Sequence, residues 1–217
     1  MHIQWFGQSA FQLVNDGQTI FIDPFGKMEG LTQRGLQWLY PPIVGASADL
    51  LLVTHEHGDH NGVEAIGGSP RTIRSTAGVF ESDFGKITAI ASEHDQAAGT
   101  QRGPNTIFVF EFAGLRVCHF GDFGQAALRP EQQQAIGEID LLFLPVGGMA
   151  TIGGETAAAL MRRLCPRWTV PMHTIERPRS ASWSRLTPSW RLPLIRRSGN
   201  YPAQPSTSPI GRPLMAR

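Results

Sequence analysis

The sequence predicts an α/β protein in which two β-sheets pack face to face and helices cover them on the outside. Short apolar runs separated by turn residues fill the first half of the chain, and strand-like runs alternate with helix-like segments in the second half. Hydrophobic residues make up 41% of the 217 residues, which is enough for one domain with a sizeable core. The 24 glycines and 16 prolines favour many turns over long helices.

The strands expected in the first half are short runs of apolar and β-branched residues bounded by turn residues. They cover residues 3–6, 10–14, 19–22, 50–54, 72–75 and 86–91. Asn15-Asp16-Gly17 predicts a hairpin turn between the second and third of these strands. Residues 50–54 form an almost continuous apolar run, which is typical of a strand buried on both faces. The long connection 24–48 has weak helical character at 31–40 and is typical of a lid or binding loop.

The second half alternates between strand and helix patterns. Strands are expected at 107–112, 115–120, 139–146 and 168–172, helices at 130–136 and 155–164, and a helix start at 61–66. Ala113-Gly114 predicts the turn between the first two of these strands, and Pro166 ends the last helix. We therefore expect one domain over residues 1–174.

Residues 175–217 differ sharply in composition from the rest of the chain. They contain seven Pro, eight Arg, seven Ser, no Lys and one acidic residue, with no period of 2 or 3.6. Their net charge is +7, against −6 for residues 1–174 and +1 for the whole chain. We expect an irregular, basic tail. Two hypotheses stay open: a reading-frame slip near codon 174, which would make the chain a truncated, inactive homologue, or a genuine tail that binds nucleic acid or membrane.

The two cysteines and the N-terminus bear on the compartment. Cys118 and Cys165 form neither a C-x-x-C pair nor a disulfide-rich pattern, so we expect two reduced thiols. Residues 1–11 lack the basic stretch and apolar run of a signal peptide, and no segment approaches 18 apolar residues. These features predict a cytoplasmic protein without a membrane span.

The strongest chemical signal is Thr54-His55-Glu56-His57-Gly58-Asp59-His60, which follows the predicted buried strand. Imidazole nitrogens and carboxylate oxygens are good ligands for zinc and similar ions. His55 and His57 are two residues apart, so in extended backbone their side chains point the same way. Asp59 and His60 fall on the following turn and can address a second, neighbouring metal position. The alternative is a solvated His-rich loop in which the Asp caps a helix.

This motif is similar to the H-x-H-x-D-H signature of the metallo-β-lactamase superfamily. Four further segments resemble the family's other motifs and occur in the family's order: Ile22-Asp23-Pro24-Phe25, Ser92-Glu93-His94, Cys118-His119-Phe120-Gly121-Asp122 and Val170-Pro171-Met172-His173. The resemblance covers residues 1 to about 174. It is greatest to a branch of uncharacterised metal-dependent hydrolases related to L-ascorbate-6-phosphate lactonase and N-acyl-phosphatidylethanolamine phospholipase D. One departure is Gln8, where that branch often has His.

The resemblance implies a four-layered αβ/βα sandwich with the site at the open edge of the sheets. It also implies two divalent metal ions, with zinc first and manganese or iron as alternatives. The implied ligands are His55, His57 and His94 for the first ion, Asp59, His60 and His173 for the second, and Asp122 as the bridge. Asp23 would support the ligands through hydrogen bonds. His119 would either support the site from behind or pack within its strand.

A two-metal site predicts a hydrolase. Two cations lower the pKa of a bridging water, so hydroxide forms at neutral pH and attacks a carbonyl or phosphoryl centre. Asp59 or Asp122 would orient the nucleophile and carry a proton. The expected substrate is a small ester, lactone, amide or phosphodiester. An iron-dependent oxidoreductase on the same fold is the alternative.

Nucleic acid is not an expected partner. Only 33 residues separate His60 from His94 and 27 separate His94 from Asp122, which leaves no room for the arm that nucleases of this fold carry. The substrate side is less defined by the sequence. An apolar wall or local packing is possible for Leu36, Trp38, Leu39 and Tyr40. Residues 95–105 could form a mobile rim in which Arg102 either meets an anion or stays in solvent.

Overall fold

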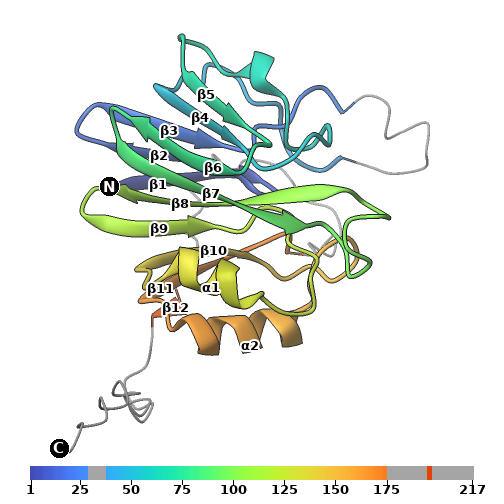
Figure 1. The fold of residues 1–217 in the computed structure, drawn as a ribbon. Helices are drawn as coiled ribbons and strands as arrows, with labels where there is room; N and C mark the ends of the chain where they lie inside the picture. The colour runs from blue at the N-terminus through green and yellow to red at the C-terminus, as the bar shows by residue number, and fades with distance from the viewer. Residues whose placement is uncertain (29–37, 175–194, 197–217) are drawn as a thin grey trace, which may run out of the picture.

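The computed structural model describes residues 1–28, 38–174 and 195–196, which form two mixed sheets (Figure 1). The five-stranded sheet contains, in spatial order, β1 (His2–Gly7), β2 (Ala10–Asn15), β3 (Gln18–Ile22), β4 (Leu50–Val53) and β5 (Arg71–Arg74). The seven-stranded sheet contains β12 (Ile195–Arg196), β11 (Trp168–Met172), β10 (Leu141–Pro145), β9 (Leu115–His119), β8 (Pro104–Phe112), β7 (Gly85–Glu93) and β6 (Gly78–Ser82).

The main core lies between the two sheets. Alternate residues along each strand point to opposite faces, so Leu13 of β2 and Leu52 of β4 face inward with Phe108 of β8. The rings of Phe11 and Phe143, one from each sheet, have centroids 4.6 Å apart. This buried interface fixes the sheets face to face, as the sequence predicted.

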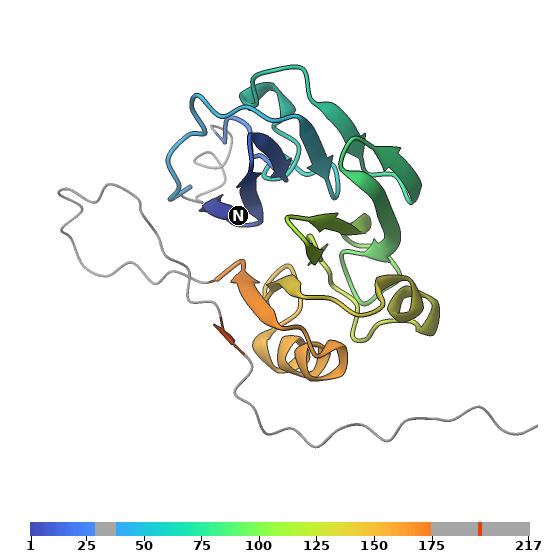
Figure 2. The ribbon, with the colours of Figure 1, turned by 90° about the vertical axis from the view of Figure 1, so that its left-hand side faces the viewer.

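Different elements cover the outer faces of the two sheets. Helices α1 (Pro130–Ile136) and α2 (Gly154–Leu164) lie outside the seven-stranded sheet (Figure 2) and bury Ile136 and Leu160 against it. In the described residues, loops and the short 3-10 helix η2 (Val63–Ala65) cover Phe21 and Leu51 on the five-stranded sheet. The predicted α/β sandwich is confirmed.

The predicted helix start at 61–66 is wrong beyond one 3-10 turn. Gly62 packs so closely on the backbone of Phe25 and Gly26 that a Cβ there would collide with it. The Gly62 N–H donates to the Pro24 carbonyl at 2.7 Å, and the Gly26 N–H donates to the Gly58 carbonyl at 3.2 Å. These bonds join the loop after β4 to the chain after β3. A regular helix at 61–66 would keep its backbone groups from making them.

Other differences concern the sheet edges and the uncertain segments. The sequence did not predict β6, an edge strand with largely exposed side chains, nor β12, which pairs antiparallel with β11. The weak helix expected at 31–40 lies mostly at 29–37, outside the described residues, as do 175–194 and 197–217. Cys118 and Cys165 are both free, as expected. Among the described residues, no helix is long and apolar enough to cross a membrane.

Strand directions bring several strand ends to one edge of the sandwich. β3 and β4 run parallel, and so do β9, β10 and β11. β7 runs in the direction of β9, because both pair antiparallel with β8. The loops that follow these strands therefore meet at one edge, and these loops carry the predicted site residues.

Candidate metal centre

The seven predicted ligands come together at this edge of the sandwich. They follow four different strands: His55, His57, Asp59 and His60 after β4, His94 after β7, Asp122 after β9 and His173 after β11. The chain turns sharply at His173, whose φ is +52°. Gly147 beside it has no Cβ, and one there would collide with the His173 carbonyl.

Three histidines form a first group. A ring nitrogen from each of His55, His57 and His94 lies within 4.8 Å of the other two. Nε2 of His55 is 3.0 Å from Nδ1 of His57, and the His55 and His94 ring centroids are 4.9 Å apart. His55 and His94 are buried and His57 is exposed, so one side of this group faces outward. Three imidazole nitrogens at this separation could be ligands of one metal ion.

A second group contains His60, His173, Asp59 and Asp122. Oδ1 of Asp122 lies 2.7 Å from Nε2 of His173 and 3.3 Å from Nε2 of His60. The His60 and His173 rings stack with centroids 5.6 Å apart. Oδ2 of Asp59 is 3.6 Å from Nε2 of His60, and the Asp59 side chain is 30% exposed. The second group therefore has one partly exposed carboxylate.

Asp122 lies between the two groups. Its Oδ2 is 3.0 Å from Nε2 of His94 and 4.0 Å from Nε2 of His55, on the side of the first group. Its Oδ1 faces His60 and His173, on the side of the second. One buried carboxylate thus contacts both groups, an arrangement suited to a bridging ligand.

Several of these atoms are buried, close together and without a hydrogen bond. Within the described residues, Nε2 of His60, Nε2 of His173 and Oδ1 of Asp122 have no hydrogen-bond partner despite their short separations. Their directions, rather than their distances, prevent a bond. Buried polar atoms without partners are costly. Nitrogen and carboxylate donors that converge without bonding one another fit a metal ion, which would accept their lone pairs.

Asp23 fixes the orientation of two histidines from behind. This fully buried carboxylate accepts hydrogen bonds from the Thr54 N–H at 2.7 Å, the Thr54 hydroxyl at 2.8 Å and Nδ1 of His60 at 3.0 Å. Because the Thr54 hydroxyl donates to Asp23, its oxygen accepts from Nδ1 of His55 at 3.0 Å. When neutral, both rings therefore direct an unprotonated Nε2 into the cluster, which is the tautomer that binds a metal in place of a proton.

The electrostatics of the cluster favour added positive charge. Burial alone would raise the pKa of Asp122, but His60 and His173 hold it well below its ordinary value. Burial alone would lower the pKa of His60, but Asp122 and Asp23 raise it well above its ordinary value. Burial and the neighbouring His60 lower the pKa of His55 to about 3. Two buried carboxylates thus draw a proton onto His60, and a cation at the cluster would supply the same charge.

His119 connects the two sheets behind the site. Its fully buried ring donates from Nε2 to the Ser9 carbonyl at 3.1 Å and accepts the Gly121 N–H on Nδ1 at 3.2 Å. Ser9 belongs to the turn between β1 and β2, and its Oγ lies 2.8 Å from Nδ1 of His60. Of the two roles left open for His119, the supporting one is therefore favoured. Sequence reasoning missed Ser9 and Thr54, since hydroxyl residues carry no distinctive spacing.

The segment 95–105, predicted to be a mobile rim, is tied down in the structure. The Asp95 carboxylate accepts backbone N–H bonds from Ala97, Gly99, Gln101 and Arg102 at 2.7–3.0 Å. Residues 104 and 105 belong to β8. In the structure the segment therefore forms a hydrogen-bonded turn after His94, and it does not line the cavity over the cluster.

A cavity of about 400 Å³ opens over the cluster. Its lining comes from the turn after β1, the segment after residue 37, the cluster itself and the loop between β10 and α2. The residues are Gln8, Trp38, Leu39, Tyr40, Asp59, Asp122, Gly147, Met149, Ala150, Thr151, His173 and Thr174. Three of the four apolar residues predicted to border the site, Trp38, Leu39 and Tyr40, thus line this cavity, whereas the fourth, Leu36, lies outside the described residues.

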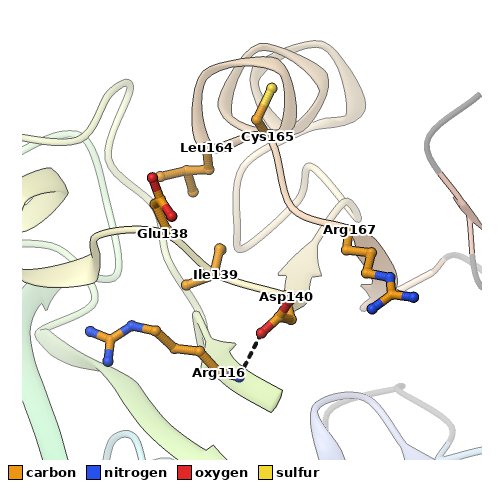
Figure 3. Close-up of a pocket in the computed structure, with 7 residues that line it drawn as sticks. All are labelled: Arg116, Glu138, Ile139, Asp140, Leu164, Cys165 and Arg167. Carbon is orange, nitrogen blue, oxygen red and sulfur yellow. Dashed lines mark hydrogen bonds between the residues drawn. The ribbon is translucent and has the colours of Figure 1, made fainter. Parts of the chain in front are cut away.

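A larger cavity, of about 710 Å³, lies at the opposite ends of the strands (Figure 3). Its lining residues precede β10 and β11 or begin β9, and they include Arg116, Asp140, Cys165 and Arg167. The Arg116 N–H donates to the Asp140 carboxylate at 2.9 Å. This cavity contains none of the predicted ligands, so the chemistry belongs to the smaller cavity at the other edge.

The fold and the histidine-aspartate cluster have a counterpart among known proteins. The sequence-family model named Beta-lactamase superfamily domain matches residues 2–173 of this chain. The chain therefore belongs to the beta-lactamase superfamily. The match ends at His173, and the basic segment that follows lies outside it.

Relatives within this superfamily are similar over most of their length. A UPF0173 metal-dependent hydrolase of Thermococcus onnurineus is 31% identical over 195 residues, covering 79% of this chain and 83% of the relative. Another, of Cupriavidus taiwanensis, is 31% identical over 224 residues, covering 82% and 76%. A solved structure from Thermotoga maritima, assigned to the Zn-dependent hydrolases of the metallo-beta-lactamase superfamily, is 34% identical with a TM-score of 0.64, covering 81% and 77%.

Proposed function

We propose that this chain is a metal-dependent hydrolase with two divalent ions, which acts on a small ester, lactone, amide or phosphodiester. The observation that carries the proposal is the set of buried nitrogen and oxygen atoms that converge at Asp122 without hydrogen bonding one another. The names of the relatives, which are metal-dependent or Zn-dependent hydrolases, support it. Zinc is the first candidate because imidazole nitrogens dominate the donor set, and manganese and iron are the alternatives.

The proposed ligands follow the two groups of the cluster. The first ion would be held by His55, His57 and His94, whose ring nitrogens approach one another, with Nε2 of His55 3.0 Å from Nδ1 of His57. The second would be held by Asp59, His60 and His173, and Asp122 would serve both ions through its two oxygens. Asp23 and Thr54 would keep His55 and His60 in the metal-binding tautomer.

The protein groups around the ions would divide the work of hydrolysis. When bound, two divalent ions lower the pKa of water so that hydroxide exists near neutral pH, and they polarise the substrate oxygen. Asp59 is partly exposed and lines the cavity, so its carboxylate is placed to orient the attacking water and to accept its proton. Asp122 is buried and holds the two histidine groups at a fixed separation.

Metal content and activity of ligand variants test this proposal. Purified wild-type protein is expected to contain two zinc equivalents by plasma mass spectrometry. His57→Ala and Asp122→Ala are expected to lose metal and all hydrolysis of ester, lactone and phosphodiester substrates, with an unchanged far-ultraviolet circular dichroism spectrum. His2→Ala, at an exposed histidine outside the cluster, is the matched control and should keep both. Full activity in either ligand variant would remove the two-metal proposal, and iron after aerobic expression would favour the oxidoreductase.

The proposal includes a reducing, cytoplasmic compartment. The two free cysteines support it, because Cys118 is buried in the sheet and Cys165 lies on the surface with no disulfide partner among the described residues. A small-molecule substrate is supported by the cavity over the cluster, whose size of about 400 Å³ suits a ligand rather than a polymer.

A further inference from the structure

The cavity over the cluster is lined by polar and by large apolar residues. The polar ones are the cluster residues Asp59, Asp122 and His173, together with Gln8, Thr151 and Thr174. The large apolar ones come from two segments far apart in the chain, with Trp38, Leu39 and Tyr40 from the connection before β4 and Met149 from the loop between β10 and α2. We call the four residues Trp38, Leu39, Tyr40 and Met149 the apolar wall. A substrate bound at the cluster would have these apolar residues beside it.

Two members of the apolar wall expose an unusual amount of hydrocarbon. Leu39 is 51% exposed and Met149 is 85% exposed, and both are among the few large hydrophobic residues that the described chain leaves in solvent. Their exposure is unfavourable in the free protein, because apolar surface in contact with water costs free energy. Two such residues from separate segments flank one cavity, which is the pattern of a binding surface rather than of scattered surface residues.

The back of the apolar wall is fixed by aromatic packing. The Trp38 ring meets Phe25 at a centroid distance of 4.9 Å and Tyr40 at 5.3 Å, and Tyr40 meets Trp5 at 5.7 Å. Gly7 allows this arrangement, since a Cβ there would collide with the Tyr40 ring. Local packing and a role in the cavity wall are therefore compatible, because Trp38 and Tyr40 make these ring contacts and also line the cavity. A preformed apolar surface binds a ligand with less loss of entropy than a mobile one.

We propose that the apolar wall binds an alkyl chain of the substrate, next to the ester or lactone bond that the metal centre would cleave. This inference rests on the proposed function and narrows it to substrates with an apolar tail. In a lactone, the oxygen of water bonds to the carbonyl carbon, the ring C–O bond breaks, and the leaving oxygen takes a proton to become a hydroxyl. The products are a hydroxy acid with its alkyl chain, and the reaction needs no oxidant or reductant.

A series of γ-lactones with straight side chains from methyl to octyl tests the inference on the full-length, zinc-loaded protein. Each added methylene that enters the wall is expected to raise kcat/KM by about fourfold, until the wall is filled. Because the side chain of the lactone contacts the wall and not the reacting bond, KM should fall and kcat/KM should rise with chain length.

Substitutions in the wall separate it from general surface effects. Leu39→Ser and Met149→Ser are expected to flatten the dependence of kcat/KM on chain length. Val44→Ser is the matched control, because Val44 is 79% exposed and lies outside the cavity lining. The control is expected to keep the full dependence. An equal loss of the dependence in Val44→Ser would overturn the assignment to the wall.

A binding measurement distinguishes failure of this inference from failure of the proposed function. Straight-chain alkyl γ-lactams keep the shape of the lactones, and calorimetry on the metal-free, full-length protein reports their affinity without catalysis. If the octyl lactam binds more tightly than the methyl lactam in wild type but not in Leu39→Ser, the inference stands even where no lactone is hydrolysed. Lactone hydrolysis at equal rates for all chain lengths, or equal lactam affinities, would overturn the inference and leave the hydrolase intact.

Discussion

Asp23 contacts no substrate in the proposed mechanism, yet its removal should lower the affinity of the cluster for metal. Asp23 accepts hydrogen bonds from the Thr54 N–H, the Thr54 hydroxyl and Nδ1 of His60, all of them buried. We predict that Asp23→Ala destabilises the fold and weakens metal binding. Asp23→Asn should separate the two effects, because its amide oxygen still accepts from the Thr54 N–H while its NH2 group replaces Oδ2, the oxygen that faces the Thr54 hydroxyl and Nδ1 of His60.

The magnitude follows from what each variant leaves without a partner. Asp23→Ala removes the acceptor of three buried donors, and removing one partner of a buried charged pair typically costs about 3–5 kcal/mol. In Asp23→Asn the Thr54 hydroxyl can turn to accept from the new NH2 group, but His60 Nδ1–H is left without an acceptor, so we expect about 1–3 kcal/mol. Metal affinity should fall by about 10–100-fold in both variants, because His60 no longer holds the tautomer with a free Nε2.

Urea unfolding of the metal-free proteins measures the change in folding stability. Competition with a chromogenic chelator measures the change in zinc affinity. Asp83→Asn provides the control, since Asp83 is exposed in the turn between β6 and β7. Zinc affinity of Asp23→Asn within twofold of wild type would refute the tautomer argument. Equal stability of Asp23→Ala and wild type would refute the hydrogen-bond argument independently.

Three further predictions concern the metal, a buried histidine and the basic segment. Zinc at 100 times its dissociation constant should raise the unfolding free energy by about 2.7 kcal/mol over the chelated protein, and identical melting curves would contradict a structural metal centre. Burial lowers the pKa of His119 from 6.5 to about 4, so its contribution to stability is complete above pH 6.5 and about 3 kcal/mol of it is lost as pH falls toward 4. The urea midpoint of His119→Gln should therefore depend less on pH in this range than that of wild type, and parallel profiles would argue against this prediction. Translation of the coding DNA from about codon 174 in the other frames should reveal a helix and closing strands, and their absence from every frame would end the frame-slip hypothesis.

The fold was predictable where burial follows a clear period. β2, β3 and β4 are short apolar runs whose neighbours are turn residues, and the structure places them within one or two residues of the predicted bounds. β6 escaped prediction because an edge strand with exposed side chains shows little apolar alternation. The helix predicted at 61–66 failed for a tertiary reason, since the close approach of Gly62 to Phe25 and Gly26 cannot be read from local sequence.

The candidate site likewise contains residues that the sequence could predict and residues that it could not. The seven predicted ligands could be found because each follows a strand and carries a metal-binding side chain in a known order. The groups that orient them could not, because Ser9 meets His60 across 51 residues and Asp23 meets Thr54 across 31 residues. The apolar wall joins Leu39 to Met149 across the two halves of the chain, and sequence alone could name only its first half.

The division of the ligands between the sheets has a consequence for how the protein is made. His55, His57 and His60 follow a strand of the five-stranded sheet, while His94, Asp122 and His173 follow strands of the seven-stranded sheet. During synthesis the first three emerge long before His173, whose place depends on the pairing of β11 with β10. If these residues are the ligands, firm retention of the metal would wait until the last of these strands has docked. In a cell, a loaded metal centre would mark a chain whose assembly is finished.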